Sequence, residues 1–206
     1  MALYDPSNFQ RYDESPDALF YRSARLVTHI DEQAVSRVTS LYRRFLPPGG
    51  AILDLMSSWV RHLPSEVQYR RVVGLGMNGA ELDANFRLDE WLVQDLNLDP
   101  TLPFDDDEFD AAAICVSIQY LTRPTEVLRE LGRVVLPGGP IVVTVSNRCF
   151  PPKAVALWQR LNDDGHTRLV QRYLRDSGAW DYIEHVSYSS RAGDPLFAVI
   201  GRSTGA

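Results

Sequence analysis

The sequence predicts an α/β fold built on a doubly wound, mostly parallel sheet. Short apolar or β-branched segments recur along the chain, separated by stretches long enough for a helix or a crossover. Two amphipathic helical segments each end at a proline–glycine stop. The first apolar segment carries an acid near its end, as expected of a buried parallel strand that delivers a carboxylate to the carboxyl edge of a sheet. Together these patterns favour a parallel sheet covered by helices on both faces.

The helices are predicted from apolar periodicity and from start and stop signals. A first helix is predicted over residues 31–45, with Asp31 as its cap and the stop at 47–50 behind it. A second begins near Pro124, carries an apolar stripe over 127–135 and stops at Pro137-Gly138-Gly139. Further helical regions are predicted over 153–163 and 167–176, with His166 in the loop between them.

The strands are predicted where the chain is short, apolar and β-branched. Parallel strands are expected at residues 51–55, 71–75, 90–94, 111–116 and 141–145. Residues 182–188 and 196–200 flank Gly193-Asp194-Pro195 and predict a closing antiparallel hairpin. We expect one domain over residues 1–206, with an N-terminal helical extension at 1–46 and a core at 47–206.

Composition narrows the classes of partner. The net charge is −6 and charges of both signs are scattered, so no basic stripe predicts a nucleic-acid partner. No apolar stretch approaches the roughly 20 residues that span a bilayer, and the acidic N-terminus is unlike a signal peptide. We therefore expect a soluble cytoplasmic protein without a membrane partner. Cys115 and Cys149 predict buried, reduced thiols, and no residue spacing predicts a metal site. The oligomeric state is not predicted.

An ordered set of motifs carries a family resemblance. Val93-Gln94-Asp95-Leu96 is followed by Leu102-Pro103-Phe104, then by Phe109-Asp110 leading into a strand, then by residues 126–130 and 133–139. This order resembles the class I S-adenosylmethionine-dependent methyltransferases, particularly the small-molecule branch labelled type 11. The resemblance runs from about Pro47 to the C-terminus. It implies a seven-stranded sheet with an antiparallel last strand, S-adenosyl-L-methionine as cofactor, and methyl transfer to a small-molecule acceptor.

Two positions depart from the family pattern. The turn after the first strand, glycine-rich in the family, here is Met56-Ser57-Ser58-Trp59. The serine hydroxyls either bond the cofactor or cap a following helix. The acid that ends the second strand in the family is replaced by Gly76, so Asn78 or Glu81 is left to reach a ribose from the next turn. For Glu81 a solvated position on a helix is the alternative. We expect Gly76 to be needed for a positive φ or for close backbone approach.

Candidate cofactor residues follow from the strand ends, where an open doubly wound sheet binds its ligand. By resemblance, Asp95 accepts from the adenine amino group and Leu96 covers the ring; the alternative is that Asp95 caps a turn. The predicted cofactor-binding set is Asp54, Met56, Ser57, Ser58, Gly76, Asn78, Asp95, Leu96 and Val116.

Candidate acceptor residues are polar or aromatic side chains near the same edge. Methyl transfer needs alignment and at most one base, so the sequence designates no catalytic residue. The predicted acceptor-binding set is His29, Trp59, His62, Gln119, Tyr120 and Asn147, with Tyr21 and Arg148 as further candidates. For His29 a structural role before the helix is the alternative. Because of the two departures, a binding or regulatory protein that has lost catalysis is the alternative function. A nicotinamide-dependent oxidoreductase fits less well, since it also needs the missing glycines and acid.

Overall fold

The computed structural model describes residues 3–188 and 193–205. The strands are β1 (Ala51–Leu55), β2 (Arg71–Gly76), β3 (Glu90–Val93), β4 (Ala111–Cys115), β5 (Pro140–Val145), β6 (Trp180–Tyr188) and β7 (Leu196–Ser203). The helices are α1 (Asp17–Phe20), α2 (Glu32–Phe45), α3 (Gly79–Asp83), α4 (Pro124–Val134), α5 (Ala156–Gln159) and α6 (Asp163–Ser177), with 3-10 turns η1 (Pro6–Asn8) and η2 (Ile118–Tyr120).

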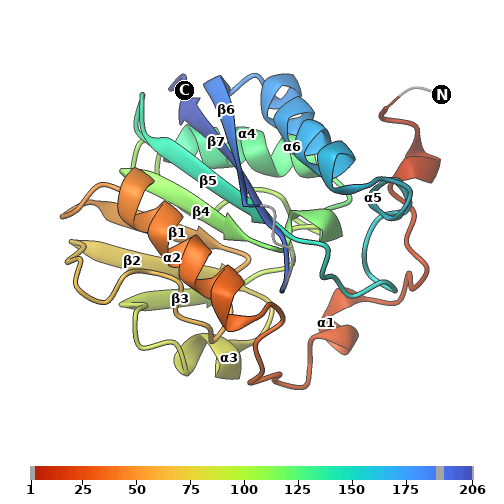
Figure 1. Cartoon of the computed structure of the whole chain (residues 1–206), viewed down its shortest axis with the longest axis horizontal. Coiled ribbons are helices and arrows are strands. Elements are labelled where there is room, and N and C mark those ends of the chain that lie inside the picture. The colour runs from red at the N-terminus through yellow and green to blue at the C-terminus, as the bar shows by residue number, and fades with distance from the viewer. Residues whose placement is uncertain (1–2, 189–192, 206) are drawn as a thin grey trace.

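The described strands form one seven-stranded sheet in the order β3-β2-β1-β4-β5-β7-β6. Strands β1 to β5 pair in parallel, whereas β7 is antiparallel to both β5 and β6 (Figure 1). The predicted fold class, including the antiparallel last strand, is confirmed. The winding reverses between β1 and β4, which are neighbours in the sheet. That reversal is the switch point at which open sheets of this kind bind ligands.

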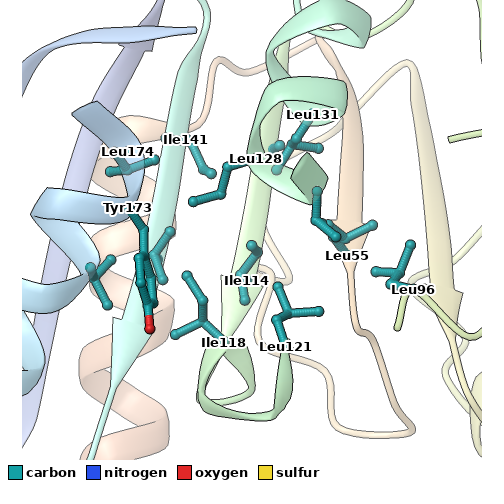
Figure 2. Close-up of a cluster of buried hydrophobic side chains, with 14 of the residues drawn as sticks. Leu55, Leu96, Ile114, Ile118, Leu121, Leu128, Leu131, Ile141, Tyr173 and Leu174 are labelled. Atoms are coloured by element: carbon teal, nitrogen blue, oxygen red, sulfur yellow. The ribbon is translucent and has the colours of Figure 1, made fainter. Parts of the chain in front are cut away.

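Helices cover both faces of the sheet because alternate strand residues point to opposite faces. On one face α2 buries Val38 and Leu41 against Ile52 and the small side chains Ala111 and Ala113, which let the helix approach closely. On the other face α4 and α6 close a larger cluster, shown in Figure 2. Its labelled members are Leu55, Leu96, Ile114, Ile118, Leu121, Leu128, Leu131, Ile141, Tyr173 and Leu174.

The helix ends follow local capping. Asp31 accepts from the backbone N–H of Ala34 at 2.8 Å, which confirms the predicted cap of α2. Two regions differ from the sequence expectation. The region 153–163 contains only the four-residue α5, and α6 begins earlier than expected because Asn162 caps it through the N–H of Gly165. His166 is therefore not a loop residue; it is buried in α6 and stacks on Trp158 with ring centroids 3.9 Å apart.

The first 30 residues contain little regular structure apart from η1 and α1. Within the expected helical extension, α2 is the long helix and belongs to the cover of the sheet. We call residues 11–30 the strap, because this segment lies across the carboxyl ends of the strands (Figure 1). In the part of the chain that is described, no helix has the length and apolar character needed to cross a membrane.

Candidate functional site

A cavity of about 230 Å³ lies at the carboxyl ends of β1, β2, β3 and β4. We divide its lining into a strand-end wall and a strap wall. The strand-end wall consists of Met56, Ser57, Ser58, Leu75, Gly76, Met77, Asn78, Glu81, Gln94, Asp95, Leu96, Asn97, Cys115, Val116, Ser117, Tyr120 and Leu121. The strap wall consists of Asp17, Tyr21, Arg25 and His29, together with Arg148, Cys149 and Phe150 after β5. The cavity therefore occupies the switch-point position of the fold.

Two non-glycine residues with positive φ flank the switch point. Met56 follows β1 with φ +58°, and Val116 follows β4 with φ +47°. A left-handed conformation costs an L-residue about 1 kcal/mol or more, and a β-branched residue rarely adopts it. Met56 stands in the turn where the family has glycines, so the turn retains a glycine-like backbone without the glycine. Such strain gathers at ligand sites when the surrounding structure enforces it.

The turn after β1 is held by short polar contacts. The N–H of Ser57 donates to the carbonyl of Leu75 at 2.8 Å, which ties the turn to β2. The hydroxyl of Ser57 donates to Asp54 Oδ2 at 2.5 Å. Burial raises the pKa of Asp54 to about 6, and the bond from Ser57 partly opposes this. Asp54 lies behind the cavity wall rather than in it.

Gly76 lies where the backbones of the two turns meet. A Cβ atom built on Gly76 would be 2.3 Å from the carbonyl oxygen of Ser57, a contact that the backbone cannot relieve without moving. The φ of Gly76 is not in the left-handed region. Close approach, and not a positive φ, is therefore the reason that this position needs glycine. No side chain can project from it, so an acid must come from elsewhere.

Two polar residues after β2 are available instead, and both already contact the strap. Glu81 on α3 accepts from the hydroxyl of Ser58 and from the backbone N–H of Arg25, each at 2.7 Å. Asn78 accepts from the N–H of Glu81 at 3.1 Å, and its Nδ2 donates to the carbonyls of Tyr21 and Arg22 at 2.8 and 3.1 Å. Both residues line the cavity. Asn78 and Glu81 therefore hold the strap against the cavity.

The loop after β3 places polar groups at the far end of the cavity. Asp95 Oδ1 accepts from the N–H of Asn97 at 3.0 Å, so Asp95 does cap a turn while it also lines the cavity. Asn97 donates to the carbonyl of Tyr120 at 3.0 Å and to Asp17 Oδ2 at 2.9 Å, and accepts from the N–H of Thr122 at 2.8 Å. Asn97 thus joins the ends of β3 and β4 to the strap.

A buried ion network anchors the first part of the strap. The ammonium of Lys153, whose side chain is fully buried, lies 3.1 Å from Asp17 Oδ1 and 3.2 Å from Asp13 Oδ2, and donates to the carbonyl of Ser15 at 2.7 Å. Arg11 donates to both carboxylate oxygens of Asp17 at 2.8 and 2.7 Å. Burial acts to raise the pKa of Asp17, but the hydrogen bonds from Arg11 and the neighbouring donors outweigh it and lower this pKa.

The residues predicted for the acceptor do not all lie together. His29 and Tyr120 line the cavity, whereas Trp59, His62, Gln119 and Asn147 do not. Trp59 Nε1 donates to the carbonyl of Val27 at 3.1 Å, and Gln119 Nε2 donates to that of Val116 at 2.9 Å. Burial lowers the pKa of His62 to about 4, so this residue is neutral at pH 7. Asn147 is exposed.

The predicted cofactor residues are more concentrated. All of them except Asp54 line the cavity. The strand-end rule did not identify Asp17, Arg25, Cys149 or Phe150, which also line it. Their positions depend on how the strap and the segment after β5 fold back over the sheet, and no local sequence signal encodes that path. Within the described residues, no cluster of three or more His, Cys, Asp or Glu side chains is arranged to hold a metal ion.

A sequence comparison places the chain beside methyltransferases. A family model described as a methyltransferase domain matches residues 58–143. A ubiquinone/menaquinone biosynthesis C-methyltransferase UbiE from Ruegeria sp. is 37% identical over 108 residues, which cover 52% of this chain and 42% of that relative. The matched stretches span between 21% and 42% of the curated relatives.

Solved structures share the fold at low sequence identity. The [4+2]-cyclase SpnF has a TM-score of 0.66 at 16% identity, covering 89% of each chain. Phosphoethanolamine N-methyltransferase 2 of Haemonchus contortus, solved with S-adenosyl-L-methionine, has a TM-score of 0.59 at 13% identity, covering 82% of this chain and 52% of that one. The predicted resemblance to class I S-adenosylmethionine-dependent methyltransferases is confirmed. S-adenosyl-L-methionine, the cofactor that this resemblance implies, is the one bound in the Haemonchus contortus structure.

Proposed function

We propose that this chain, similar to class I S-adenosylmethionine-dependent methyltransferases in motif order and fold, binds the cofactor at its strand-end wall and methylates a small molecule. The observation that carries the proposal is the cavity at the switch point, lined by the residues that follow four parallel strands. The bound sulfonium supplies a methyl group to a nucleophile. The protein then has to hold the cofactor and the acceptor, align them with each other and exclude water. This requires few catalytic groups.

The lining fits the parts of the cofactor in order along the strand ends. Ser57 and Ser58, in the turn after β1, offer hydroxyls and backbone to the amino-acid end. At the other end Asp95 keeps one carboxylate oxygen outside its turn for the adenine amino group, and Leu96 is an apolar cover. Val116 supplies an apolar contact after β4.

We assign binding of the ribose hydroxyls to Glu81. Gly76 has no room for a side chain. Among the acids that line the cavity, Glu81 is the nearest in sequence to the end of β2. It accepts one hydroxyl and one N–H from the protein, a pair of donors like the two ribose hydroxyls. Binding therefore exchanges the bonds from Ser58 and Arg25 for bonds from the ribose, and loosens the strap as it does so.

The cavity volume supports a moving strap. At about 230 Å³ it is smaller than the roughly 300–1,000 Å³ of pockets that enclose drug-sized ligands. A nucleoside cofactor and an acceptor together need more space. We expect residues 18–30 to shift when the cofactor enters, while the buried network at residues 11–17 stays in place.

Calorimetric titration with S-adenosylhomocysteine tests the proposal. Wild type binds, and Glu81→Gln weakens binding about tenfold, because a neutral amide replaces a carboxylate in two hydrogen bonds. The matched control is Glu32→Gln in the first turn of α2, which lies outside the cavity and leaves the affinity unchanged. A wild-type protein with no affinity for S-adenosylhomocysteine would overturn the proposal.

A second candidate is a protein of this fold that binds a ligand without transferring a methyl group. The glycine-poor turn after β1 and the missing acid at Gly76 favour it, and the fold alone does not specify methyl transfer. Binding of S-adenosylhomocysteine, with no methyl transfer from labelled cofactor to any acceptor tested, is the result that favours this candidate.

A further inference from the structure

We infer that the strap wall forms an acceptor compartment for a planar, conjugated molecule with an acidic hydroxyl, such as a phenol, and not for an ammonium compound. This inference names the acceptor class of the proposed methyltransferase and rests on that function. It follows from the rings, the cations and the uncommitted polar groups that the strap and the segment after β5 bring together.

Aromatic rings dominate this part of the cavity. The ring of Phe150 lies at the centre, with its centroid 4.9 Å from that of His29, 5.8 Å from that of Tyr120 and 6.4 Å from that of Tyr21. The first and last of these pairs meet edge to face, whereas Tyr120 is stacked at an interplanar angle of 28°. Aromatic walls of this kind accept either a flat apolar ring or a cation.

The protein itself places a cation against these aromatic rings. The guanidinium carbon of Arg25 lies 4.5 Å from the ring centroid of Phe20, 5.4 Å from that of Phe150 and 5.8 Å from that of Tyr21. Arg148 lines the same wall, but its Nε pairs with Asp194 Oδ1 at 2.7 Å, so its charge is largely balanced. A cationic acceptor would be repelled by Arg25, whereas a neutral or anionic ring is attracted to it.

The carboxylates of the cavity are also committed. Asp17 is paired with Arg11 and Lys153. Glu81 accepts from Ser58 and Arg25, and it lies toward the proposed ribose position. An ammonium acceptor would therefore find no uncommitted carboxylate on the strap wall among the described residues.

Two uncommitted groups suit a hydroxyl acceptor. Tyr21 lines the cavity, and its hydroxyl makes no hydrogen bond within the described chain. Burial raises the pKa of Tyr21, so it remains a hydrogen-bond donor. His29 also lines the cavity without a hydrogen bond to its ring. Burial and the charge of Arg25 lower the pKa of His29, against the opposing effect of Glu81, so the imidazole is neutral and can take a proton.

The residues then have distinct roles. The proton of the acceptor hydroxyl passes to His29, and the electron pair left on the oxygen forms the bond to the methyl group as the methyl–sulfur bond breaks, its pair remaining on sulfur. Tyr21 donates to an acceptor oxygen, Phe150 packs on the ring, and Arg25 stabilises the developing negative charge.

The test measures binding of three ring compounds by calorimetry, to the protein alone and with S-adenosylhomocysteine: catechol, 4-hydroxybenzoate and benzylamine. We expect the two phenols to bind and benzylamine to bind at least tenfold more weakly. Tyr21→Phe should weaken catechol binding about fivefold, as for one hydrogen bond. His29→Gln should leave catechol binding within about twofold and lower any catechol methylation about a hundredfold. His185→Gln, an exposed histidine on β6, is the matched control and changes neither.

Each outcome of these titrations either supports or overturns the inference. Tighter binding of benzylamine than of both phenols, absence of phenol binding, or catechol binding that is insensitive to Tyr21→Phe overturns the inference. Failure of S-adenosylhomocysteine to bind overturns the proposed function instead, and the titrations of the protein alone then still report on the compartment.

Discussion

The two walls of the cavity are held in place by different means. The strand-end wall is built by parallel strand register and by backbone bonds such as that from the N–H of Ser57 to the carbonyl of Leu75. The strap wall is held by a few side chains, above all Lys153, Asn78 and Glu81. Backbone pairing in a buried sheet fixes geometry cooperatively, whereas side-chain clasps open one at a time. The strand-end wall is therefore the rigid part of the site and the strap the movable part.

Within the strap the two ends differ as well. Residues 11–17 are tied by buried charges, and residues 18–30 by bonds between partly exposed groups. The anchor at Asp17 therefore contributes to folding, whereas the contacts at Asn78 and Glu81 can be exchanged for a ligand. Of the next three predictions, the first tests this anchor and the other two test the rigidity of the strand-end wall, with the largest effect first.

Removing the buried cation should have the largest effect on stability. Lys153→Met leaves Asp17 and Asp13 without their nearest ammonium, and we expect the free energy of unfolding in urea to fall by about 3 kcal/mol. Arg172→Met is the matched control, since Arg172 is 61% exposed where it pairs with Asp176, and it should leave the free energy of unfolding nearly unchanged. Equal losses in the two variants would show that the strap is not anchored by the buried network.

A methyl group at Gly76 should have an intermediate effect. Gly76→Ala forces the turns after β1 and β2 apart, because its Cβ meets the Ser57 carbonyl at 2.3 Å, and we expect a loss of about 2 kcal/mol together with weaker S-adenosylhomocysteine binding. Gly79→Ala is the comparison, since its Cβ would meet only side-chain atoms, the ring of Trp91 at 3.3 Å and Val93 Cγ2 at 3.6 Å. Unchanged stability and tighter binding in Gly76→Ala would contradict the close-packed wall.

The pH dependence of Asp54 should have the smallest effect, about 1 kcal/mol once its partial exposure is allowed for. Its folded pKa of about 6 lies above its usual value of 3.8, so the folded state binds the proton more tightly. The stability that it contributes is complete below pH 3.8 and is lost as the pH rises through 6. In urea titrations the wild type should lose stability relative to Asp54→Asn between pH 4 and pH 6. A difference that does not vary over that range would show that Asp54 is well solvated.

The elements with a local structural cause follow most directly from the sequence. Each of the first five predicted strands agrees with its observed strand to within one residue at either end, since each is a short apolar segment between strong turn signals. The cap of α2 at Asp31 and the start of α4 at a proline were also predicted correctly. The region before α6 was not, because Asn162 starts the helix ahead of a glycine and an exposed acidic turn that resemble a loop.

The candidate site likewise has one part that local sequence patterns predict and another part that they do not. Strand ends in a parallel sheet meet at one edge, so residues such as Ser57, Asn78 and Asp95 were predicted to lie together, and they do line one cavity. Trp59 ends the same turn and His62 lies three residues beyond it, but neither lines the cavity, because the chain leaves the sheet edge there. Periodicity cannot specify the direction in which an irregular segment turns.

The sequence by itself determined the sheet, its helical cover and the edge at which a ligand binds, because these follow from the alternation of apolar residues and from the order of the strands. The tertiary structure alone decided that Gly76 is a packing glycine and that the strap brings Tyr21, Arg25 and His29 over the strand ends. Contacts between residues far apart in the chain, such as Lys153 with Asp17 and Glu81 with Arg25, hold the strap there. Their energies depend on burial, which exists only once the chain has folded.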